Sequence, residues 1–452
     1  MAKYQKYAEY KNSGVDWLGN IPSHWEIVPV GRLFIRLKRT GFPDQELLSV
    51  YRDYGVIPKS SRDDNNNKPS DDLGQYQLVN PNDLVMNKMK AWQGSIAISE
   101  YEGIVSPAYF VYQPLRSLFK RALPKYVHYL LRNPRYIAQY LRQSKGIRVN
   151  QWDLDPEEFQ RIELVLPPKS EQNQIFKFLD YETAKIDSLI VKQEKLIELL
   201  KEKRQAVISH AVTKGLNPDV AMKDSGVEWL GEVPEHWGAT KIKYVAELTP
   251  KKSELSNSDS RLCTFIPMEK LKLGSLVKDE EKQISEVIGG YTYFKDGDLL
   301  LAKVTPCFEN KNMVVANDLK NGIGFGSSEI YVLRTNSKVN TQFLYYRLQE
   351  DQFIELATGA MTGAGGLKRV PSEFLNNFEF ALPPLSEQIT IKEYLDQYLI
   401  KNECLMNKAQ SAIQLMKERR TALISAAVTG KIDVRNWQNP NNNNEAKMEF
   451  SA

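Results

Sequence analysis

The longest regular pattern in the chain is an apolar stripe with alternating steps of three and four residues, and it occurs twice. One stripe lies within residues 171–213 and the other within 387–429, and each predicts a single long α-helix. Ser170 precedes the first helix as a candidate N-cap, and a glycine follows each helix, at 215 and at 430. At ~1.5 Å per residue, each helix would be roughly 60 Å long. The expected stripe consists of Ile186, Leu189, Gln193, Leu196, Leu200, Lys203, Val207 and Ala211 in the first helix, and of Leu405, Ala409, Ala412, Met416 and Leu423 in the second.

An apolar stripe of this length is not stable when it faces water. We therefore expect the two helices to bury their stripes against each other as a coiled coil. The spacing does not set the direction of the pair. We expect an antiparallel pair, because it would relate the two halves of the chain by a pseudo-twofold axis.

The regions that precede the long helices carry a mixed pattern, which predicts an α+β fold. Short apolar runs at 96–99, 109–113, 313–316 and 330–334 predict strands, and amphipathic patterns at 124–143 and 341–357 predict helices. Pro134, in the stretch NPRY, interrupts the first helical pattern and predicts a kink. The polar loop 61–74 is expected to be mobile.

The chain is a tandem duplication. SGVDWLGNIPSHW (13–25) shares nine of thirteen residues with SGVEWLGEVPEHW (225–237), and EKRQAVISHAVT (202–213) shares eight of twelve with ERRTALISAAVT (418–429). PPKSEQ (167–172) likewise recurs as PPLSEQ (383–388). The offsets of 212 to 216 residues are too long for a solenoid repeat and indicate two whole domains.

Between the repeated motifs the two halves share little identity. A faint common frame survives, since NDLVMNK (82–88) parallels GDLLLAK (297–303). We therefore expect two similar mixed α/β domains with one scaffold and different surface residues. The predicted boundaries are a first domain at 1–166, a first spacer helix at 167–215, a second domain at 216–382, a second spacer helix at 383–435, and a disordered tail at 436–452.

Composition narrows the class of protein only slightly. The net charge of +4 and the pI of about 8.6 permit a nucleic-acid partner without requiring one. No stretch is long and apolar enough to span a membrane, and the first residues do not form a secretory signal, so we expect no membrane partner. The three scattered cysteines fit neither a disulfide framework nor a zinc site, which favours a cytoplasmic location.

No combination of residues predicts catalysis or metal binding. His24 and His236 lack cysteine or acidic partners at ligand spacing, so we interpret them as structural histidines. The glycine-rich stretch 358–366 is not followed by the Lys-Ser/Thr of a phosphate-binding loop. It is either a flexible surface loop or a loop that contacts a DNA backbone together with Lys368 and Arg369.

Basic, amide and aromatic residues gather in the two unlike middles. Lysine and arginine suit phosphates, whereas asparagine, glutamine and arginine suit base edges in the major groove. Such clusters are usually solvated faces, but their unlike forms on two like scaffolds favour recognition. The candidate DNA-binding residues are Lys59, Arg62, Asn87, Lys88, Lys90, Trp92, Gln93, Arg142, Lys145, Arg148, Lys270, Lys303, Thr305, Lys311, Asn312, Thr362, Lys368 and Arg369.

The doubled motifs, in this order, resemble the specificity (S) subunit of a Type I restriction–modification system. The resemblance covers about residues 10–435 and includes SGVxWLGxxPxHW, LPPxSEQ, GDLLLAKVTPCFENK and the helix end at 419–433. It implies two target recognition domains, each reading one half of a bipartite, asymmetric DNA site. The paired helices would then measure the non-specific spacer between the half-sites.

The resemblance also implies partners. Two modification subunits would carry S-adenosylmethionine and methylate adenine, and motor-nuclease restriction subunits would use ATP and Mg. This chain would be non-catalytic, hold no cofactor or metal, and act in defence against phage. The duplicated segments would present one surface to each of two identical partners. The candidate partner-binding residues are Trp17, Trp25, Trp229, Trp237, Arg204 and Arg420, although the tryptophans are equally candidates for core anchors.

A different class of function is an alternative. The chain would then be a coiled-coil scaffold that binds proteins and has no DNA specificity. Sequence-specific binding in the presence of excess non-specific DNA separates the two hypotheses.

Overall fold

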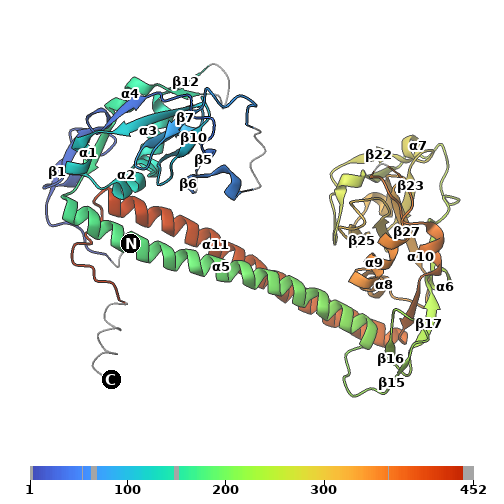
Figure 1. Cartoon of the computed structure of the whole chain (residues 1–452). Helices are drawn as coiled ribbons and strands as arrows, with labels where there is room; N and C mark the ends of the chain where they lie inside the picture. The colour runs from blue at the N-terminus through green and yellow to red at the C-terminus, as the bar shows by residue number, and fades with distance from the viewer. Residues whose placement is uncertain (1–3, 53, 63–68, 147–151, 365, 441–452) are drawn as a thin grey trace, which may run out of the picture. The chain divides into compact units, whose positions relative to one another are not determined.

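The computed structural model describes residues 4–52, 54–62, 69–146, 152–364 and 366–440 (Figure 1). It divides into two compact units. Unit 1 comprises residues 1–193 and 411–452, and unit 2 comprises residues 194–410. Both long helices contribute to both units, so this division differs from the domain boundaries expected from the sequence.

Unit 1 is a mixed α/β body. Its strands are β1 (Tyr10–Asn12), β2 (Asn20–Pro22), β3 (Glu26–Pro29), β4 (Phe34–Leu37), β5 (Leu48–Tyr51), β6 (Gly55–Pro58), β7 (Gln77–Val79), β8 (Leu84–Asn87), β9 (Ile96–Ile98), β10 (Gly103–Val105), β11 (Tyr109–Pro114), β12 (Ser144–Lys145), β13 (Asp153–Leu154) and β14 (Glu163–Leu166). Its short helices are α1 (Arg116–Arg121), α2 (Pro124–Leu131), α3 (Pro134–Gln143) and α4 (Pro156–Arg161). The central sheet is antiparallel, in the order β4-β11-β8-β9.

Unit 2 is built in the same way. Its strands are β15 (Met222–Asp224), β16 (Glu232–Pro234), β17 (Gly238–Lys241), β18 (Ala246–Leu248), β19 (Leu262–Ile266), β20 (Leu271–Lys272), β21 (Ser275–Leu276), β22 (Glu281–Gln283), β23 (Thr292–Lys295), β24 (Leu299–Ala302), β25 (Met313–Val315), β26 (Ile323–Gly326), β27 (Ile330–Thr335) and β28 (Glu379–Leu382). Its short helices are α6 (Ile242–Val245), α7 (Ile284–Val287), α8 (Thr341–Arg347), α9 (Asp351–Gly359) and α10 (Ser372–Asn377). The strands expected at 96–99, 109–113, 313–316 and 330–334 are confirmed as β9, β11, β25 and β27.

The two units share one strand topology. The sheet β18-β27-β24-β25 of unit 2 repeats the order β4-β11-β8-β9 of unit 1, and the pair β17-β28 repeats β3-β14. A second sheet, β22-β19-β26-β23, contains a parallel pair between β19 and β26. In unit 1 the corresponding ladder is reduced to a single parallel bridge between Leu47 and Ile104. The expectation of a common scaffold under divergent residues is therefore confirmed at the level of topology.

The two long helices are present close to the expected residues. α5 runs from Lys169 to Lys214 and α11 from Leu385 to Val428, against the expected 171–213 and 387–429. In unit 1, Arg420 of α11 pairs with Asp187 of α5 at 2.9 Å. In unit 2, the side-chain amide of Asn402 donates to the backbone oxygen of Leu200 at 3.2 Å.

The expected register of the stripe is partly wrong. Leu189, Leu196 and Lys203 are exposed, whereas the positions one residue later, Ile190, Ile197 and Arg204, turn inward. In α11, Leu405 is 52% exposed and Asn402 is buried instead. The segment 186–204 carries apolar residues on two neighbouring stripes, and spacing alone did not distinguish which of them packs.

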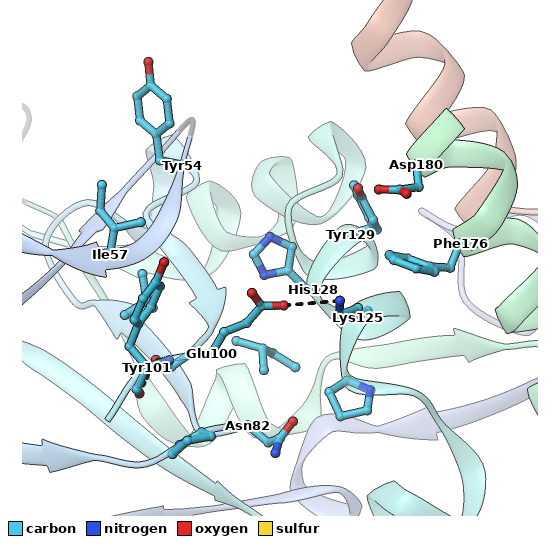
Figure 2. A pocket seen from close by; sticks show the side chains of 15 residues that line it. Tyr54, Ile57, Asn82, Glu100, Tyr101, Lys125, His128, Tyr129, Phe176 and Asp180 are labelled. Atoms are coloured by element: carbon cyan, nitrogen blue, oxygen red, sulfur yellow. Dashed lines mark hydrogen bonds and ion pairs between the residues drawn. The ribbon is translucent and has the colours of Figure 1, made fainter. Parts of the chain in front are cut away.

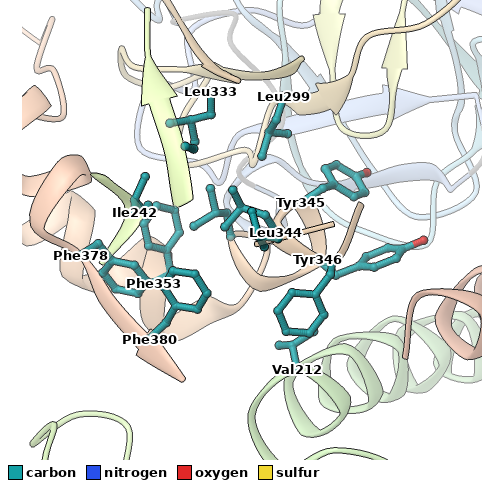
Figure 3. Packing of buried hydrophobic residues seen from close by; sticks show 14 of the residues in the cluster. Val212, Ile242, Leu299, Leu333, Leu344, Tyr345, Tyr346, Phe353, Phe378 and Phe380 are labelled. Carbon is teal, nitrogen blue, oxygen red and sulfur yellow. The ribbon is translucent and has the colours of Figure 1, made fainter. Parts of the chain in front are cut away.

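The ends of the long helices belong to the cores of the units. Val212 of α5 lies in the main apolar cluster of unit 2 with Phe353, Phe378 and Phe380 (Figure 3). Ile391 and Leu395 of α11 join the same cluster, and all of these side chains are at most 4% exposed. Burying one such side chain stabilises the fold by about 1.5–3 kcal/mol. Each long helix is therefore held by tertiary packing at the end that lies in unit 2.

Three expectations about shorter segments need comment. The pattern at 124–143 breaks at Pro134 into α2 and α3, with the Asn133 side chain accepting a hydrogen bond from the Arg135 amide at 2.8 Å, which confirms the predicted interruption. The pattern at 341–357 also breaks, into α8 and α9. The disordered tail was expected to begin at residue 436, but Trp437 packs against Phe178 with ring centroids 5.5 Å apart. Residues 441–452 lie outside the described residues.

Candidate DNA interface

In each unit, one strand of the central sheet ends in a lysine that the backbone holds in the same way. The amide of Lys88, after β8, donates to the oxygen of Ala108 at 3.2 Å, and the amide of Lys303, after β24, donates to the oxygen of Glu329 at 3.0 Å. The Lys88 oxygen accepts from the Leu154 amide at 3.2 Å, and the Lys303 oxygen accepts from the Val370 amide at 2.9 Å. We call the surroundings of these two lysines the strand-end sites.

The strand-end site of unit 1 is basic and aromatic. The turn after β8 carries Lys90, Trp92 and Gln93, and the ring of Trp92 lies 5.1 Å from that of Trp152, which comes just before β13. Gly94 has a φ of +93°, and a Cβ at this position would lie 2.8 Å from Ile137 of α3, so a glycine is needed for the turn to pack on that helix. Arg142 and Lys145 follow at the end of α3 and are exposed.

The structure thus brings together most of the residues predicted from the sequence of the first middle. Asn87 has a local role, because its side-chain oxygen accepts from the Met89 amide at 3.1 Å. Lys59 and Arg62 lie elsewhere, after β6, where Arg62 covers the ring of Tyr54 at 4.5 Å. Arg148 lies outside the described residues.

The strand-end site of unit 2 is built from the loop that contains the glycine-rich stretch. The Thr305 hydroxyl donates to the Gly366 oxygen at 2.7 Å and accepts from the Lys368 amide at 3.1 Å. Thr362 and Arg369 exchange backbone hydrogen bonds of 3.0 and 2.8 Å. Arg369 also forms an ion pair with Glu329. The loop is therefore pinned to the end of β24, with Lys368 and Arg369 exposed beside it.

Three predicted DNA contacts of unit 2 need correction, because two of the side chains have partners inside the chain and the third is buried. Lys270 lies between Asp279 and Glu280, at 2.7 and 2.9 Å. The Lys311 ammonium donates to the Gln349 oxygen and to Asp351, at 2.7 and 2.5 Å. Asn312 is buried. Composition marked these residues as basic or amide-bearing, but it does not show that the fold gives Lys270 and Lys311 acidic partners within the chain.

The duplicated motifs form one joint in each unit, which we call the clasp. In unit 1, the carboxylate of Glu171 accepts from Trp25 Nε1 at 3.0 Å and from the Tyr7 hydroxyl at 2.5 Å, and it contacts His24 Nε2 at 2.7 Å. Gly430, at the end of α11, adopts a φ of +70°, and a Cβ there would lie 3.3 Å from Trp25. The first clasp is defined by Trp25, Glu171 and Gly430.

The second clasp repeats this arrangement with Trp237, Glu387 and Gly215. Glu387 accepts from Trp237 Nε1 at 3.1 Å and contacts His236 Nε2 at 2.7 Å. A Cβ on Gly215, at the end of α5, would lie 3.2 Å from Glu387 and 3.4 Å from Trp237. The three repeated motifs thus recur together because they meet in one structural joint, and the structural interpretation of both histidines is confirmed.

The clasps correct part of the predicted partner surface. Trp25 and Trp237 are 0% and 1% exposed, so they are core anchors and not surface residues. Trp17 packs edge-on against Tyr136 at 4.9 Å, and Trp229 stacks on Phe378 at 4.9 Å. Both are partly exposed.

The two predicted partner-binding arginines are partly exposed and lie on the long helices. Arg420 pairs with Asp187, so it takes part in a contact within the chain. Arg204 is half-buried on α5.

Several residues that position the sites were missed by sequence reasoning. Gln172 accepts from the Leu123 amide, and Gln388 accepts from the Asn340 amide, both at 2.8 Å, which ties each long helix to the unit it follows. Asp298, just before β24, forms an ion pair with Arg334. Sequence reasoning could have found them by their repetition. Gln172 and Gln388 end the repeated motif PPxSEQ, and Asp298 lies in GDLLLAK, which parallels NDLVMNK. Trp152 had no such signal.

A cavity of about 570 Å³ lies in unit 1 at the opposite end of β8 from the strand-end site (Figure 2). Its lining includes Tyr101, Tyr129 and the pair Glu100–Lys125, whose charged atoms are 3.6 Å apart. His128 of α2 also faces it. His128 lies four residues before Arg132, and in unit 2 the residue four before Arg347 is Phe343, so the histidine is not duplicated.

His128 is expected to make stability depend on pH. Burial, and then the charge of Arg132, lower the pKa of His128 to about 4. Between the ordinary pKa of 6.5 and about 4, the unfolded chain binds a proton that the folded chain does not, so the free energy of unfolding falls as the pH falls. At about 1.4 kcal/mol per pKa unit, the full effect is about 3 kcal/mol.

Urea unfolding at several pH values, for the wild type and for His128→Phe, measures this effect. Wild-type stability should fall more steeply between pH 6.5 and 4 than that of the variant. Parallel curves for the two proteins would contradict the assignment.

Among the described residues, no group of three or more histidine, cysteine, aspartate or glutamate side chains could hold a metal ion. No helix in the described part of the chain is long and apolar enough to cross a membrane.

Comparison with known proteins places this geometry in a family. The model of the "Type I restriction modification DNA specificity domain" matches residues 22–199 and 234–414, one match in each repeat. The EcoEI specificity subunit of Escherichia coli is 36% identical over 163 residues, which are 35% of this chain and 27% of that protein, so this chain spans about a quarter of that relative's length. The MjaVIII specificity subunit of Methanocaldococcus jannaschii is 24% identical over 92% of this chain and 95% of that protein.

The fold has a counterpart among solved structures. A chain in a structure concerned with complex assembly and conformational transition of the type I R-M system has a TM-score of 0.61 and 16% identity, over 90% of this chain and 98% of that chain. At this identity the likeness concerns the fold. Because the family match covers both repeats and most of the sequence, the chain belongs to the family of Type I restriction–modification DNA specificity proteins.

Proposed function

We propose that the chain is the sequence-specificity subunit of a Type I restriction–modification enzyme. It reads a bipartite, asymmetric DNA site, one half through the strand-end site of each unit. The observation that carries this proposal is that equivalent lysines, Lys88 and Lys303, stand on matched frameworks amid different side chains. An aromatic pair flanks the first, and the Arg369–Glu329 pair flanks the second. The alternative, a scaffold without DNA specificity, has no support in the family match.

In this proposal α5 and α11 form an antiparallel coiled coil that sets the spacing between the half-sites and relates the units by a pseudo-twofold axis. The Asp187–Arg420 pair and the Asn402–Leu200 hydrogen bond support it. Antiparallel pairing also agrees with the clasps, in which the beginning of one helix meets the end of the other. A buried asparagine in such a seam favours one register over others.

The partners are proposed from the family. Two modification subunits would bind near the two clasps and carry S-adenosylmethionine for adenine methylation, and restriction subunits would supply ATP- and Mg-dependent activity. This chain would be the non-catalytic subunit, in the cytoplasm. The clasps would act indirectly, by fixing the partly exposed residues around them, such as Trp17 and Trp229.

Lys90→Gln is expected to weaken DNA binding about equally for all sequences. The exposed ammonium of Lys90 would contact a phosphate. Affinity falls as salt rises, and the loss of one such contact makes the slope of log affinity against log salt less steep by about 1. Binding of the full chain to duplex DNA, measured against excess non-specific competitor at several salt concentrations, gives this slope.

The matched control is Lys120→Gln. Lys120 is an exposed lysine of α1, and α1 follows the end of β11 that lies away from Lys88. Its slope should equal that of the wild type. Equal slopes for all three proteins would remove Lys90 from the interface, and a wild type that competitor DNA displaces completely would contradict the proposed function.

A further inference from the structure

The side chain of Arg369 is held from one edge. Its Nε donates to Glu329 Oε2 at 2.8 Å, and its Nη2 donates to Oε1 at 3.0 Å. These two hydrogen bonds use the side edge of the guanidinium. Three of its five N–H groups remain, two on Nη1 and one on Nη2. One N–H of Nη1 and one N–H of Nη2 point along the side chain, away from the backbone, and lie parallel to each other; we call this the forward edge.

The forward edge of Arg369 is available to a ligand. The arginine side chain is 47% exposed and the glutamate side chain 26%. Two parallel donors at this spacing match the O6 and N7 acceptors of guanine in the major groove, which is the commonest specific contact of arginine with DNA. An isolated lysine at the same place would offer a point charge without this pairing.

The backbone around the pair is also fixed. Arg369 exchanges two hydrogen bonds with Thr362, and the next residue, Val370, donates to Lys303 at 2.9 Å. Hydrogen bonding to Arg369 lowers the pKa of Glu329, so the carboxylate stays ionised at neutral pH and keeps its hold. A side chain held in advance loses less conformational entropy when it binds.

The corresponding position in unit 1 carries no carboxylate. The residue whose backbone oxygen accepts from Lys88 is Ala108, in the place that Glu329 takes beside Lys303. The exposed pair adds little to folding stability, since surface ion pairs of this kind contribute little. The same side-on geometry occurs in the Arg261–Asp259 pair, so what distinguishes Arg369 is its place in the strand-end site beside Lys303.

We propose that Arg369 reads a guanine in the half-site bound by unit 2, and that Glu329 is a positioning residue that aims the guanidinium. This inference rests on the proposed function and deepens it. It predicts that one half-site contains a guanine whose recognition depends on this pair, and that the other half-site does not depend on it.

The test is selection of duplexes from a randomised library by the full chain, followed by sequencing. Arg369→Lys should lower the preference for that guanine about 5- to 150-fold, while the second half-site keeps its bases. Glu329→Gln should lower the same preference by a smaller factor, with an unchanged midpoint of thermal unfolding. The control is Arg261→Lys, because Arg261 forms a similar side-on pair with Asp259, through Nε at 3.1 Å and Nη2 at 2.6 Å, beside β19 in the other sheet. Its motif should equal that of the wild type.

Failure of the inference is distinguishable from failure of the proposed function. A wild-type motif that Arg369→Lys leaves unchanged would overturn the assignment of Arg369 and leave DNA specificity in place. A loss of guanine preference in Arg369→Lys but not in Glu329→Gln would overturn the positioning role of Glu329. A wild type that enriches no motif would overturn the proposed function and this inference together.

Discussion

Replacing Glu171 by alanine is expected to lower the free energy of unfolding of unit 1 by about 3–5 kcal/mol. The carboxylate is 5% exposed and lies among Tyr7, His24 and Trp25. Its removal would leave the buried indole N–H and phenol hydroxyl without an acceptor, and each such loss costs about 1–3 kcal/mol. The pKa of Tyr7 is raised by burial and then by Glu171, so the hydroxyl remains a donor at all ordinary pH values.

Glu387→Ala is the matched control, because the second clasp is the weaker of the two. Glu387 is 28% exposed, and among the described residues its carboxylate bonds to Trp237 and His236, so a loss of about 1–2 kcal/mol is expected in unit 2. Hydrogen exchange measured by mass spectrometry reports the stability of each unit separately. Equal losses in the two variants would contradict the difference between the clasps, and a loss below about 1 kcal/mol in Glu171→Ala would show that the clasp does not hold unit 1 together.

Insertion of one heptad in both long helices is expected to lengthen the spacer of the recognised site. Seven residues at ~1.5 Å extend a helix by about 10 Å, which corresponds to at most about three base pairs of ~3.4 Å. The insertions belong after Gln193 and after Gln410, at the boundary between the units. Both half-site sequences should persist, because the strand-end sites are unchanged.

Insertion in α5 alone is the control for the paired insertion. It shifts one helix against the other, so the Asp187–Arg420 and Leu200–Asn402 contacts could not both form. This variant should alter the spacer irregularly or fail to assemble with its partners. Sites selected from libraries with variable spacers measure both variants. An unchanged spacer in the doubly extended chain, or altered half-site bases, would refute the idea that the helices measure distance.

The sequence predicts the long helices well, because three-and-four spacing over residues 186–211 and 405–423 is a strong local signal. It does not predict which stripe packs. Leu189 and Leu196 form as regular a stripe as Ile190 and Ile197, and only the opposite helix decides between them. The break at Asn133–Pro134 was predictable, because proline has a local effect.

The clasps show a different limit. The repeated motifs were visible in the sequence, yet their meeting joins Trp25, Glu171 and Gly430, which are separated by well over a hundred residues. The same limit applies to the strand-end sites. The common frame NDLVMNK and GDLLLAK predicted where the strands lie, but not which nearby residues have partners within the chain. Lys311 and Lys88 look alike in the sequence, but tertiary structure gives Lys311 an internal partner in Asp351.

We propose that one chain carries two different DNA readers at a set separation. Sequencing the methylated bases in the genome of cells that express this chain with a modification subunit tests this proposal. We predict modified adenines in one asymmetric motif, made of two unlike short sequences with a constant unspecified gap. A single continuous motif, a palindrome, or methylation that does not change when this chain is omitted would contradict the claim.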